Sequence, residues 1–350
     1  MSLYNITKPL LFQLSPETAH ALAHEGLKLV DGTPFESGLA RAFVVDDDRL
    51  STSAFGCEFP NPIGVAAGFD KTAEAPGALG ALGFGHVEVG GVTAEPQDGN
   101  PRPRVFRLVE DEAIINRMGL NNPGADVIGE RLDRTDVSIP VGVNLAKTED
   151  VPMDEAAADY RYTYEQTADG GDFFVINVSC PNSPGIRELQ NRESLADIFG
   201  TLKDAGASPL LVKLSPDLPK PAVEETLELV DEYDLDGVIA TNTTTERPET
   251  LRSPDRVEEG GLSGRPIEEQ ATEMVRFVAR RTDVPVVGVG GVFTAADAYR
   301  KIRAGASLVQ IYTGFIFRGP TIARNVNRGL ATLLERDGFE SVEDAVGADL

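Results

Sequence analysis

Short apolar runs rich in β-branched residues recur along the chain from residue 62 onward. Each run is apolar at successive positions, which is typical of strands buried between a core and a layer of helices. The stretches between most of them, such as residues 221–233 and 267–281, repeat apolar residues with the helical period. The runs are PIGVAAG (62–68), HVEVGGV (86–92), VGVNLA (141–146), FFVINVS (173–179), LLVKLS (210–215), GVIATN (237–242), VPVVGVGGV (284–292) and LVQIYTG (308–314).

Strand–helix alternation repeated eight times in about 250 residues predicts an α/β fold, a (β/α)8 TIM barrel. A doubly wound open sheet is the alternative, and the lack of a GxGxxG motif after the first strand weakens it. We place the barrel at residues 51–337, after an N-terminal helical extension (1–50) and before an acidic C-terminal tail (338–350) that is a candidate for disorder.

The N-terminal extension is helical and unusually apolar at its start. Residues 7–14 and 16–30 predict two helices, with Ser15 as N-cap and Pro16 at the first position of the second. The first helix is either a lid on the barrel or an element that binds a membrane surface or a lipophile, and the pattern leaves both open. His20 and His24 have a spacing that can bind metal, but without a third ligand we interpret them as an ordinary exposed pair and predict no metal site.

Composition limits the possible partners. The 350 residues include 56 acidic and 32 basic ones, for a net charge of −24, so no basic footprint for nucleic acid is present. We interpret the acidity as a solvated surface suited to a salty cytoplasm, with an ordinary acidic enzyme as the alternative. Two cysteines cannot form a disulfide framework, and we expect no secretory signal. No apolar run reaches the roughly 18 residues that span a bilayer, so the chain is soluble or lies on a membrane.

Polar residues gather where the predicted strands end, which is where barrel enzymes place their chemistry. The glycines of GVGGV (288–292) and of the turn after the eighth strand further predict a phosphate site for a phosphorylated ligand. The polar residues in question are Asp70, Lys71, Asn144, Asn177, Ser179, Cys180, Asn182, Lys213, Thr241, Asn242, Tyr312 and Thr313.

Motifs in a fixed order give the chain a resemblance. It resembles the dihydroorotate dehydrogenase family, over nearly its whole length in the class 2, quinone-reducing form. The matching motifs are AAGFDK (66–71), NRMGLNN (116–122), INVSCPNSPG (176–185), KLSPDL (213–218), GVIATNTT (237–244), GGLSGRP (260–266), GVGGV (288–292) and LVQIYTGFIFRGP (308–320).

The resemblance implies an FMN enzyme of de novo pyrimidine biosynthesis. It would oxidise (S)-dihydroorotate to orotate and reduce a membrane quinone, as a peripheral protein on the cytoplasmic side of the cell membrane. By the same resemblance, FMN would contact Ala67, Gly68, Lys71, Asn144, Asn177, Lys213, Thr241, Gly264, Gly291, Tyr312 and Thr313. The substrate would contact Lys71, Asn116, Arg117, Met118, Gly119, Leu120, Asn121, Asn177, Asn182, Asn242 and Thr243.

Two positions depart from the class 2 pattern. The family residue at position 180 is the base that takes the ring proton; class 2 members typically have serine there and class 1 members cysteine, and this chain has Cys180. A thiol, with an unperturbed pKa of about 8.5, becomes a base near neutral pH more easily than a hydroxyl. Ser179 is expected to be structural. Gly91 stands where the family usually has a threonine near the flavin.

Other functions fit parts of the pattern. The cysteine base leaves a class 1 acceptor, fumarate or NAD, as an alternative to quinone. A flavin-free aldolase with Lys213 or Lys71 as a Schiff base, and a non-enzymatic barrel that binds a phosphorylated ligand, are the others. An RNA-dihydrouridine reductase is disfavoured because the chain is strongly acidic.

Overall fold

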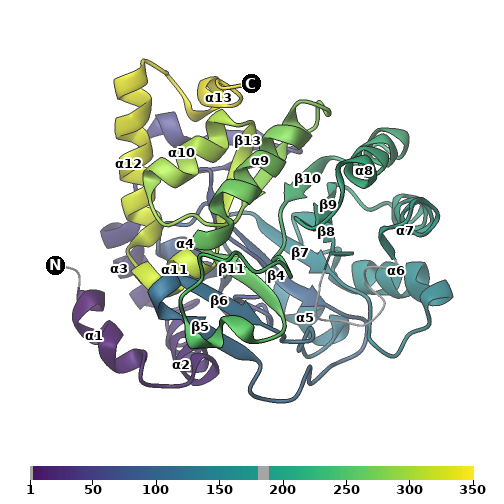
Figure 1. Cartoon of the computed structure of the whole chain (residues 1–350), viewed down its shortest axis with the longest axis horizontal. Coiled ribbons are helices and arrows are strands. Elements are labelled where there is room, and N and C mark those ends of the chain that lie inside the picture. The colour runs from purple at the N-terminus through teal and green to yellow at the C-terminus, as the bar shows by residue number, and fades with distance from the viewer. Residues whose placement is uncertain (1–2, 180–188) are drawn as a thin grey trace.

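The computed structural model describes residues 3–179 and 189–350 (Figure 1). Eight parallel strands form a closed barrel, which confirms the predicted fold class. Each strand overlaps one of the eight apolar runs. The strands are β3 (Ile63–Val65), β4 (His86–Val92), β7 (Val141–Leu145), β8 (Phe173–Ile176), β9 (Leu210–Leu214), β10 (Gly237–Ala240), β12 (Val286–Val289) and β13 (Ala306–Ile311).

The alternation of side chains along each strand separates two cores. In β9, Leu210 and Val212 pack outward in the large cluster between strands and helices, whereas Leu211 packs inside the barrel. In β8, Phe174 packs outward and Val175 inward in the same way. The residue two places after each inward apolar residue therefore also faces the barrel axis, at the C-terminal mouth.

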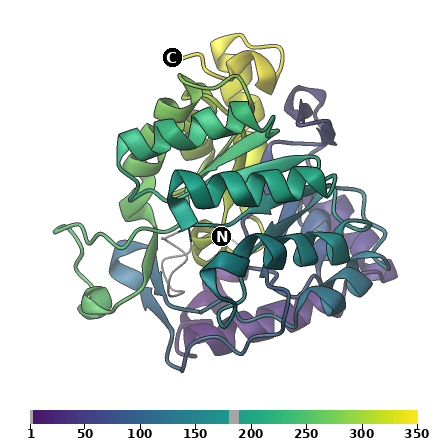
Figure 2. The same cartoon turned by 90° about the vertical axis from the view of Figure 1, so that its right-hand side faces the viewer.

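Helices form a layer outside the strands, as Figure 2 shows for the helices that stand in front of the barrel. Their apolar stripes supply the outer half of the large cluster. They are α4 (Pro76–Ala81), α5 (Ala125–Leu132), α6 (Ala156–Thr167), α7 (Arg192–Asp204), α8 (Lys220–Glu232), α9 (Glu268–Ala279), α10 (Ala295–Arg303), α11 (Thr313–Arg318) and α12 (Ile322–Asp337).

Two small sheets were not predicted. A hairpin of β1 (Thr52–Ala54) and β2 (Cys57–Phe59) closes the N-terminal end of the barrel, where Phe55 packs on Phe173 with ring centroids 5.2 Å apart. An antiparallel sheet of β5 (Val105–Leu108), β6 (Ala113–Asn116) and β11 (Gly261–Gly264) lies at the opposite, C-terminal mouth. Strand β11 lies about 150 residues after β6, so no local pattern reveals the pairing of these two strands.

The N-terminal extension forms three helices, α1 (Leu3–Leu11), α2 (Pro16–Lys28) and α3 (Pro34–Phe43). Ser15 is the N-cap of α2, as predicted, and its Oγ accepts from the Thr18 N–H at 3.2 Å. The first helix begins and ends earlier than the predicted 7–14, and the third was not predicted. In Figure 1, α2 lies beside β5, at the mouth of the barrel.

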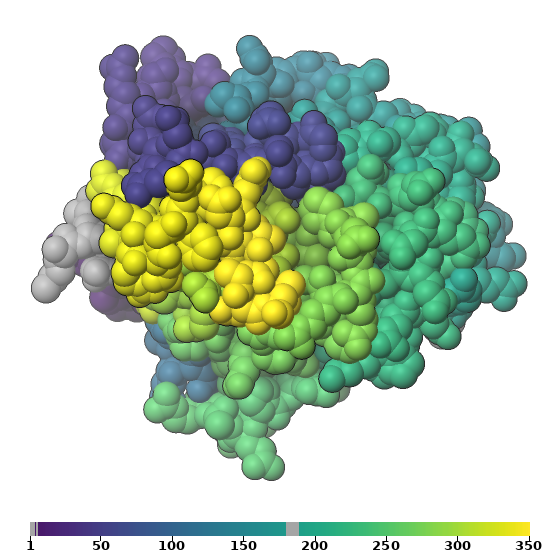
Figure 3. Space-filling model, turned by 90° about the horizontal axis from the view of Figure 1, so that it is seen from above, coloured from purple at the N-terminus to yellow at the C-terminus, as the bar shows by residue number. Residues whose placement is uncertain are grey.

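The C-terminal tail is folded, so the expectation of disorder is wrong. Ser341 caps a short helix, α13 (Val342–Ala345), through a capping box, and Val342 and Ala345 are fully buried. Arg303 Nε donates to Asp349 Oδ1 at 3.0 Å. Figure 3 shows this C-terminal segment, yellow, lying directly against the body of the molecule. Burial of the two apolar side chains, the helix cap and the contact with Arg303 together hold a tail that looks merely acidic in sequence.

Candidate active site

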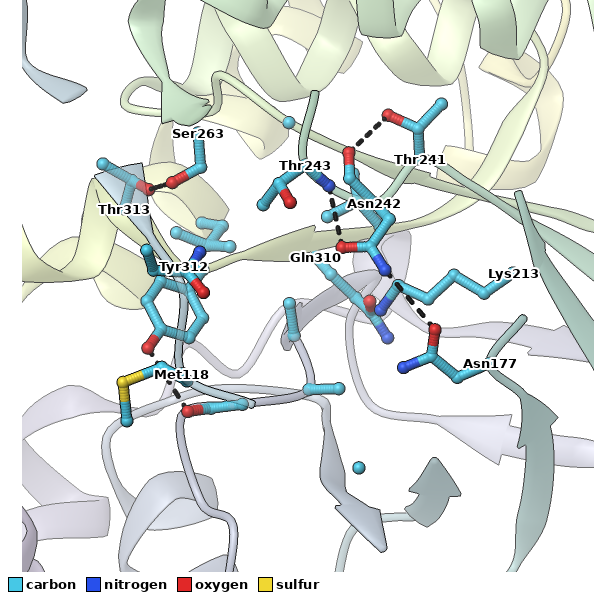
Figure 4. Close-up of a pocket in the computed structure, with 18 of the residues that line it drawn as sticks. Met118, Asn177, Lys213, Thr241, Asn242, Thr243, Ser263, Gln310, Tyr312 and Thr313 are labelled. Atoms are coloured by element: carbon cyan, nitrogen blue, oxygen red, sulfur yellow. Dashed lines mark hydrogen bonds between the residues drawn. The ribbon is translucent and has the colours of Figure 1, made fainter. Parts of the chain in front are cut away.

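A polar cleft opens at the C-terminal mouth of the barrel (Figure 4). It brings together side chains from the ends of most strands and from the β5–β6–β11 sheet. The predicted residues that line it are Ala67, Gly68, Lys71, Asn116, Met118, Gly119, Leu120, Asn121, Asn177, Lys213, Thr241, Asn242, Thr243, Gly264, Gly291, Tyr312 and Thr313. Gly91 lines it as well.

Among the predicted site residues that the structure describes, Asn144 and Arg117 stand apart from this lining. Asn144 is fully buried one layer below the cleft. Arg117 turns away from it: its Nη1 donates to Glu258 at 2.9 Å, and its guanidinium lies 4.5 Å from the ring centroid of Phe106. Cys180 and Asn182 lie outside the described residues.

Asparagine side chains form a hydrogen-bonded chain from the barrel interior to the mouth. Asn177 Nδ2 donates to Asn144 Oδ1 at 2.8 Å. Asn242 Nδ2 donates to Ser179 Oγ at 3.0 Å, and its Oδ1 accepts from the Thr243 N–H at 2.8 Å. Ser179 is buried and bonded within this chain, in keeping with the structural role expected of it.

Glu88, which the sequence reasoning missed, lies at the lower end of this chain. Its Oε1 accepts from Asn144 Nδ2 at 2.5 Å and lies 3.2 Å from Lys213 Nζ. Glu88 is fully buried and Lys213 nearly so. The available signal was an acidic residue at an inward position of an otherwise apolar strand, HVEVGGV.

Lys71 follows β3 and stands at the edge of the cleft. Its Nζ donates to the carbonyl oxygen of Gly68. Burial lowers the pKa of Lys71 to about 8, against the opposing effect of neighbouring Asp70. A lysine with a pKa this close to neutrality can bind an anion and can also lose its charge in a mildly alkaline solution.

Buried polar atoms without a partner point to a missing ligand. Both amide atoms of Gln310, which is almost fully buried and faces the cleft, have no hydrogen-bond partner among the described residues (Figure 4). Asn121 Oδ1 is likewise buried with no hydrogen-bond partner among the described residues. Each such group costs about 1–3 kcal/mol unless a ligand or water satisfies it. A flat ring with donors and acceptors along its edge, such as a flavin, fits these groups.

The loop after β12 lies between α9 and the cleft. One side of it packs against α9, and the other side lines the cleft. Gly291 has a φ of 72°, and a Cβ there would lie 2.3 Å from Glu268 Cβ. The loop can therefore take this path only with glycine. Beside it, the hydroxyls of Ser263 and Thr313 are 2.8 Å apart and face the same end of the cleft. Hydroxyls next to an open glycine backbone suit an oxygen-rich anion.

A second cavity, of about 640 Å³, lies between helices α1 and α2 and the barrel mouth. Its lining is mostly apolar, with Phe12 and Leu22 on the helix side and Phe69 and Phe315 on the barrel side. It shares five lining residues with the polar cleft: Lys71, Asn116, Met118, Asn121 and Tyr312. The two cavities are therefore adjacent, and the side chains of these shared residues form the wall between them.

The interpretation of His20 and His24 as an exposed pair is wrong. Both line this second cavity. His20 packs edge-on against Phe69 with centroids 5.1 Å apart, and burial lowers its pKa to about 3. His24 Nε2 lies 3.1 Å from Asp70 Oδ1. Residues 3–179 and 189–350 contain no cluster of three histidine, cysteine or acidic residues that could hold a metal ion.

Within the described ranges, the helices are too short or too polar for any of them to cross a bilayer.

Known proteins of one family resemble the chain throughout. The sequence profile described as "Dihydroorotate dehydrogenase" matches residues 49–334. A "Dihydroorotate dehydrogenase (quinone)" of Haloarcula marismortui is 68% identical over 347 residues, which cover 99% of both chains. A protein of the same name from Gloeobacter violaceus is 48% identical, again over 99% of both chains. The crystal structure of a DHODH from Eimeria tenella in complex with ferulenol superimposes with a TM-score of 0.86, at 38% identity and 95% coverage of each chain.

Proposed function

Since the chain belongs to the dihydroorotate dehydrogenase family, we propose that its flavin is FMN and that FMN binds in the polar cleft at the barrel mouth. Relatives that match the chain end to end are quinone-dependent members, so the reaction is the oxidation of dihydroorotate to orotate, in pyrimidine biosynthesis, with a quinone as acceptor. The unpartnered amide of buried Gln310 is the observation that carries the cofactor assignment, because a flat ring with donors and acceptors on its edge can satisfy both of its polar atoms. When bound, FMN would supply the hydride acceptor for oxidation of the substrate and the electron donor for the quinone.

The residues around the cleft are suited to a planar, amide-rich acid. Lys71 supplies a positive charge for the substrate carboxylate at the edge of the cleft. Asn116, Asn177 and Asn242 each offer a carbonyl acceptor and an amino group with two donors, which match the N–H and C=O groups along a pyrimidine edge. Asn177 and Asn242 are oriented by their hydrogen bonds within the asparagine chain, and Asn116 by the bond from its Nδ2 to the carbonyl oxygen of Gly261.

Cys180 is proposed as the base that takes the ring proton. It follows Ser179, whose hydroxyl is already held in the asparagine chain at the mouth of the barrel. We expect Cys180→Ser to keep FMN and bind orotate, to slow flavin reduction by dihydroorotate, and to shift its pH dependence upward, because a hydroxyl needs more help to lose its proton. Stopped-flow reduction across pH measures this; a variant with the parent's reduction rates at every pH would rule the role out.

The second cavity is proposed as the quinone site. It is apolar and large enough for a lipophilic ring, it lies against helices α1 and α2, and it shares single side chains with the flavin cleft. An apolar N-terminal helix with Ile6 and Leu10 exposed would lie on the membrane surface, as a peripheral protein on the cytoplasmic side requires. Helices 1–50 would thus be the membrane-facing part, 51–337 the catalytic barrel, and 338–350 a packed tail.

One experiment tests the proposal as a whole. The purified protein is expected to be yellow, with FMN as the released chromophore, and anaerobic dihydroorotate is expected to bleach the flavin band. A quinone analogue is then expected to restore the band faster than fumarate or NAD. A colourless protein that FMN cannot reconstitute would contradict the cofactor, and faster reoxidation by fumarate or NAD would contradict the acceptor.

A further inference from the structure

Glu88 is a buried carboxylate beneath the cleft to which the proposed function gives no role. It lies in the middle of β4 and is completely buried. Its chain neighbours Val87 and Val89 belong to the outer core cluster, so strand alternation turns Glu88 into the barrel. Removing a lone carboxylate from water costs several kcal/mol, so its partners decide what it does.

The first partner is Lys213, which also lines the cleft (Figure 4). Its Nζ lies 3.2 Å from one oxygen of Glu88 and 3.3 Å from the other. An ammonium has three donors. Among the described residues, the acceptors for Lys213 Nζ are the two oxygens of Glu88. The ammonium therefore keeps an N–H that it can donate to a ligand in the cleft above it. Glu88 also balances its charge.

The second partner is the asparagine chain. An ionised carboxylate can only accept, so Asn144 must turn its amino group toward Glu88, at 2.5 Å. Asn144 Oδ1 then faces Asn177 and accepts from its Nδ2 at 2.8 Å. Asn177 Oδ1 is left to point toward the mouth, where Asn242 Nδ2 lies 3.4 Å away. One carboxylate therefore sets the direction of successive amides up to the cleft.

We propose that Glu88 is a positioning residue with two effects: it sets the net charge that Lys213 presents to the flavin, and it fixes which way the substrate-reading asparagines face. This rests on the proposed function, since it takes the cleft to hold flavin and substrate. A merely structural ion pair would stabilise the barrel and would leave the flavin potential and the substrate affinity unchanged.

Glu88→Gln keeps the shape and removes the charge. The flavin midpoint potential, measured by anaerobic dye equilibration, is expected to become more positive, because an uncompensated ammonium favours the negatively charged reduced cofactor. KM for dihydroorotate is expected to rise by about tenfold, the size of one charge-assisted hydrogen bond, because a glutamine no longer dictates the amide directions. Lys213→Met is expected to move the potential the opposite way, and E88Q/K213M to return it toward the parent value.

Asp159→Asn is the matched control. Asp159 is a buried carboxylate on α6, away from the cleft, that accepts from the Thr148 N–H at 2.8 Å. This variant is expected to lose stability while the potential and KM stay at the parent values. Glu88→Gln with the parent's potential and KM would overturn the proposal.

Asn144→Ala tests the second proposed effect, the direction of the asparagine amides. It allows the proposal to be tested even if the Glu88→Gln protein does not bind flavin. Asn144→Ala keeps both charges of the ion pair, so KM is expected to rise by about tenfold while the potential shifts less than in Glu88→Gln. An unchanged KM in this variant would also overturn the proposal.

The parent protein must first bind flavin and be bleached by dihydroorotate. If it fails there, the proposed function is wrong; if it passes and the variants show no change, only the role of Glu88 is wrong.

Discussion

The cleft alters the chemistry of individual residues by keeping them from water. Lys71 stands half-buried beside the cleft, and burial brings the pKa of its ammonium down to about 8. Gly91 stands in the lining with neighbours on three sides. Each of these two positions leads to a measurable consequence.

Orotate binding is expected to weaken as the pH rises through about 8, because Lys71 then loses the charge that holds the carboxylate. The affinity should be constant below that pH and fall by up to roughly tenfold per unit above it. The measurement is a titration of orotate from pH 6 to 10, followed by flavin absorbance, in the Cys180→Ser background so that the thiol does not titrate. Lys71→Arg stays charged and serves as the control. Constant affinity up to pH 9.5 in the Lys71 protein would contradict this.

Gly91→Ala is expected to destabilise the protein and weaken flavin binding. A Cβ at Gly91 would lie 3.0 Å from Leu120 Cδ2 and 3.1 Å from Ala146 Cβ and Asn144 Oδ1, so the neighbours must move. Overpacking of this kind costs about 1–3 kcal/mol. Thermal unfolding and the FMN dissociation constant measure it. Gly26→Ala, where a Cβ meets nothing within 4 Å, is the matched control and should show neither loss. Equal effects in the two variants would show that Gly91 is not a packing requirement.

At the level of elements, the barrel and the N-terminal helices have separable tasks. Helix α2 contributes no buried residue, whereas strands β7 and β9 of the barrel are buried throughout. The helices nevertheless form one wall of the 640 Å³ cavity. They form part of a site, while only partly buried side chains such as Leu27 pack against the core.

Deletion of residues 1–30 is therefore expected to remove quinone reduction and to leave dihydroorotate-dependent flavin bleaching. Without α1 and α2 the quinone loses one wall of its apolar cavity, while the polar cleft keeps its lining. Anaerobic bleaching and reoxidation by a quinone analogue, measured on the same sample, separate the two half-reactions. Intact quinone turnover in the truncated protein would show that the helices do not form the quinone site.

At the scale of the whole molecule, the main feature is a large negative net charge. The net charge is −24, and relatives over 99% of the chain come from Haloarcula and Halobacterium, so the acidity belongs to a halophilic protein. Surface ion pairs such as Arg192–Glu228 are scattered over the exterior, but acidic residues outnumber basic ones by 56 to 32. The net effect of the surface in dilute solution is self-repulsion.

Thermal stability is expected to rise with KCl, because salt screens this repulsion. A gain of about 3 kcal/mol would raise Tm by roughly 4 °C, at about 2.1 cal/mol/K of unfolding entropy per residue. Differential scanning calorimetry in dilute buffer and in molar KCl measures this, with sucrose at equal osmolality as the control for surface exclusion. Equal Tm and full activity in dilute buffer would identify an ordinary acidic enzyme.

The sequence by itself determined the parts of this protein that depend on local pattern. Apolar runs such as LLVKLS gave the strands, their alternation with helices gave the barrel, and polar residues at strand ends gave most of the cleft, Lys71 and Asn177 among them. Periodicity and motif order are readable within a few residues, so these predictions needed no three-dimensional information.

Only the tertiary structure decided which distant residues meet. Glu88 and Lys213 are 125 positions apart, and β6 pairs with β11 from another loop, so no spacing predicted either contact. His20 and His24 looked exposed until the barrel mouth covered their face, and Arg117 lies within a site motif but turns outward to Glu258. The physical reason is the same in each case: burial and pairing depend on what the fold brings opposite a residue, and closure of the barrel settles that.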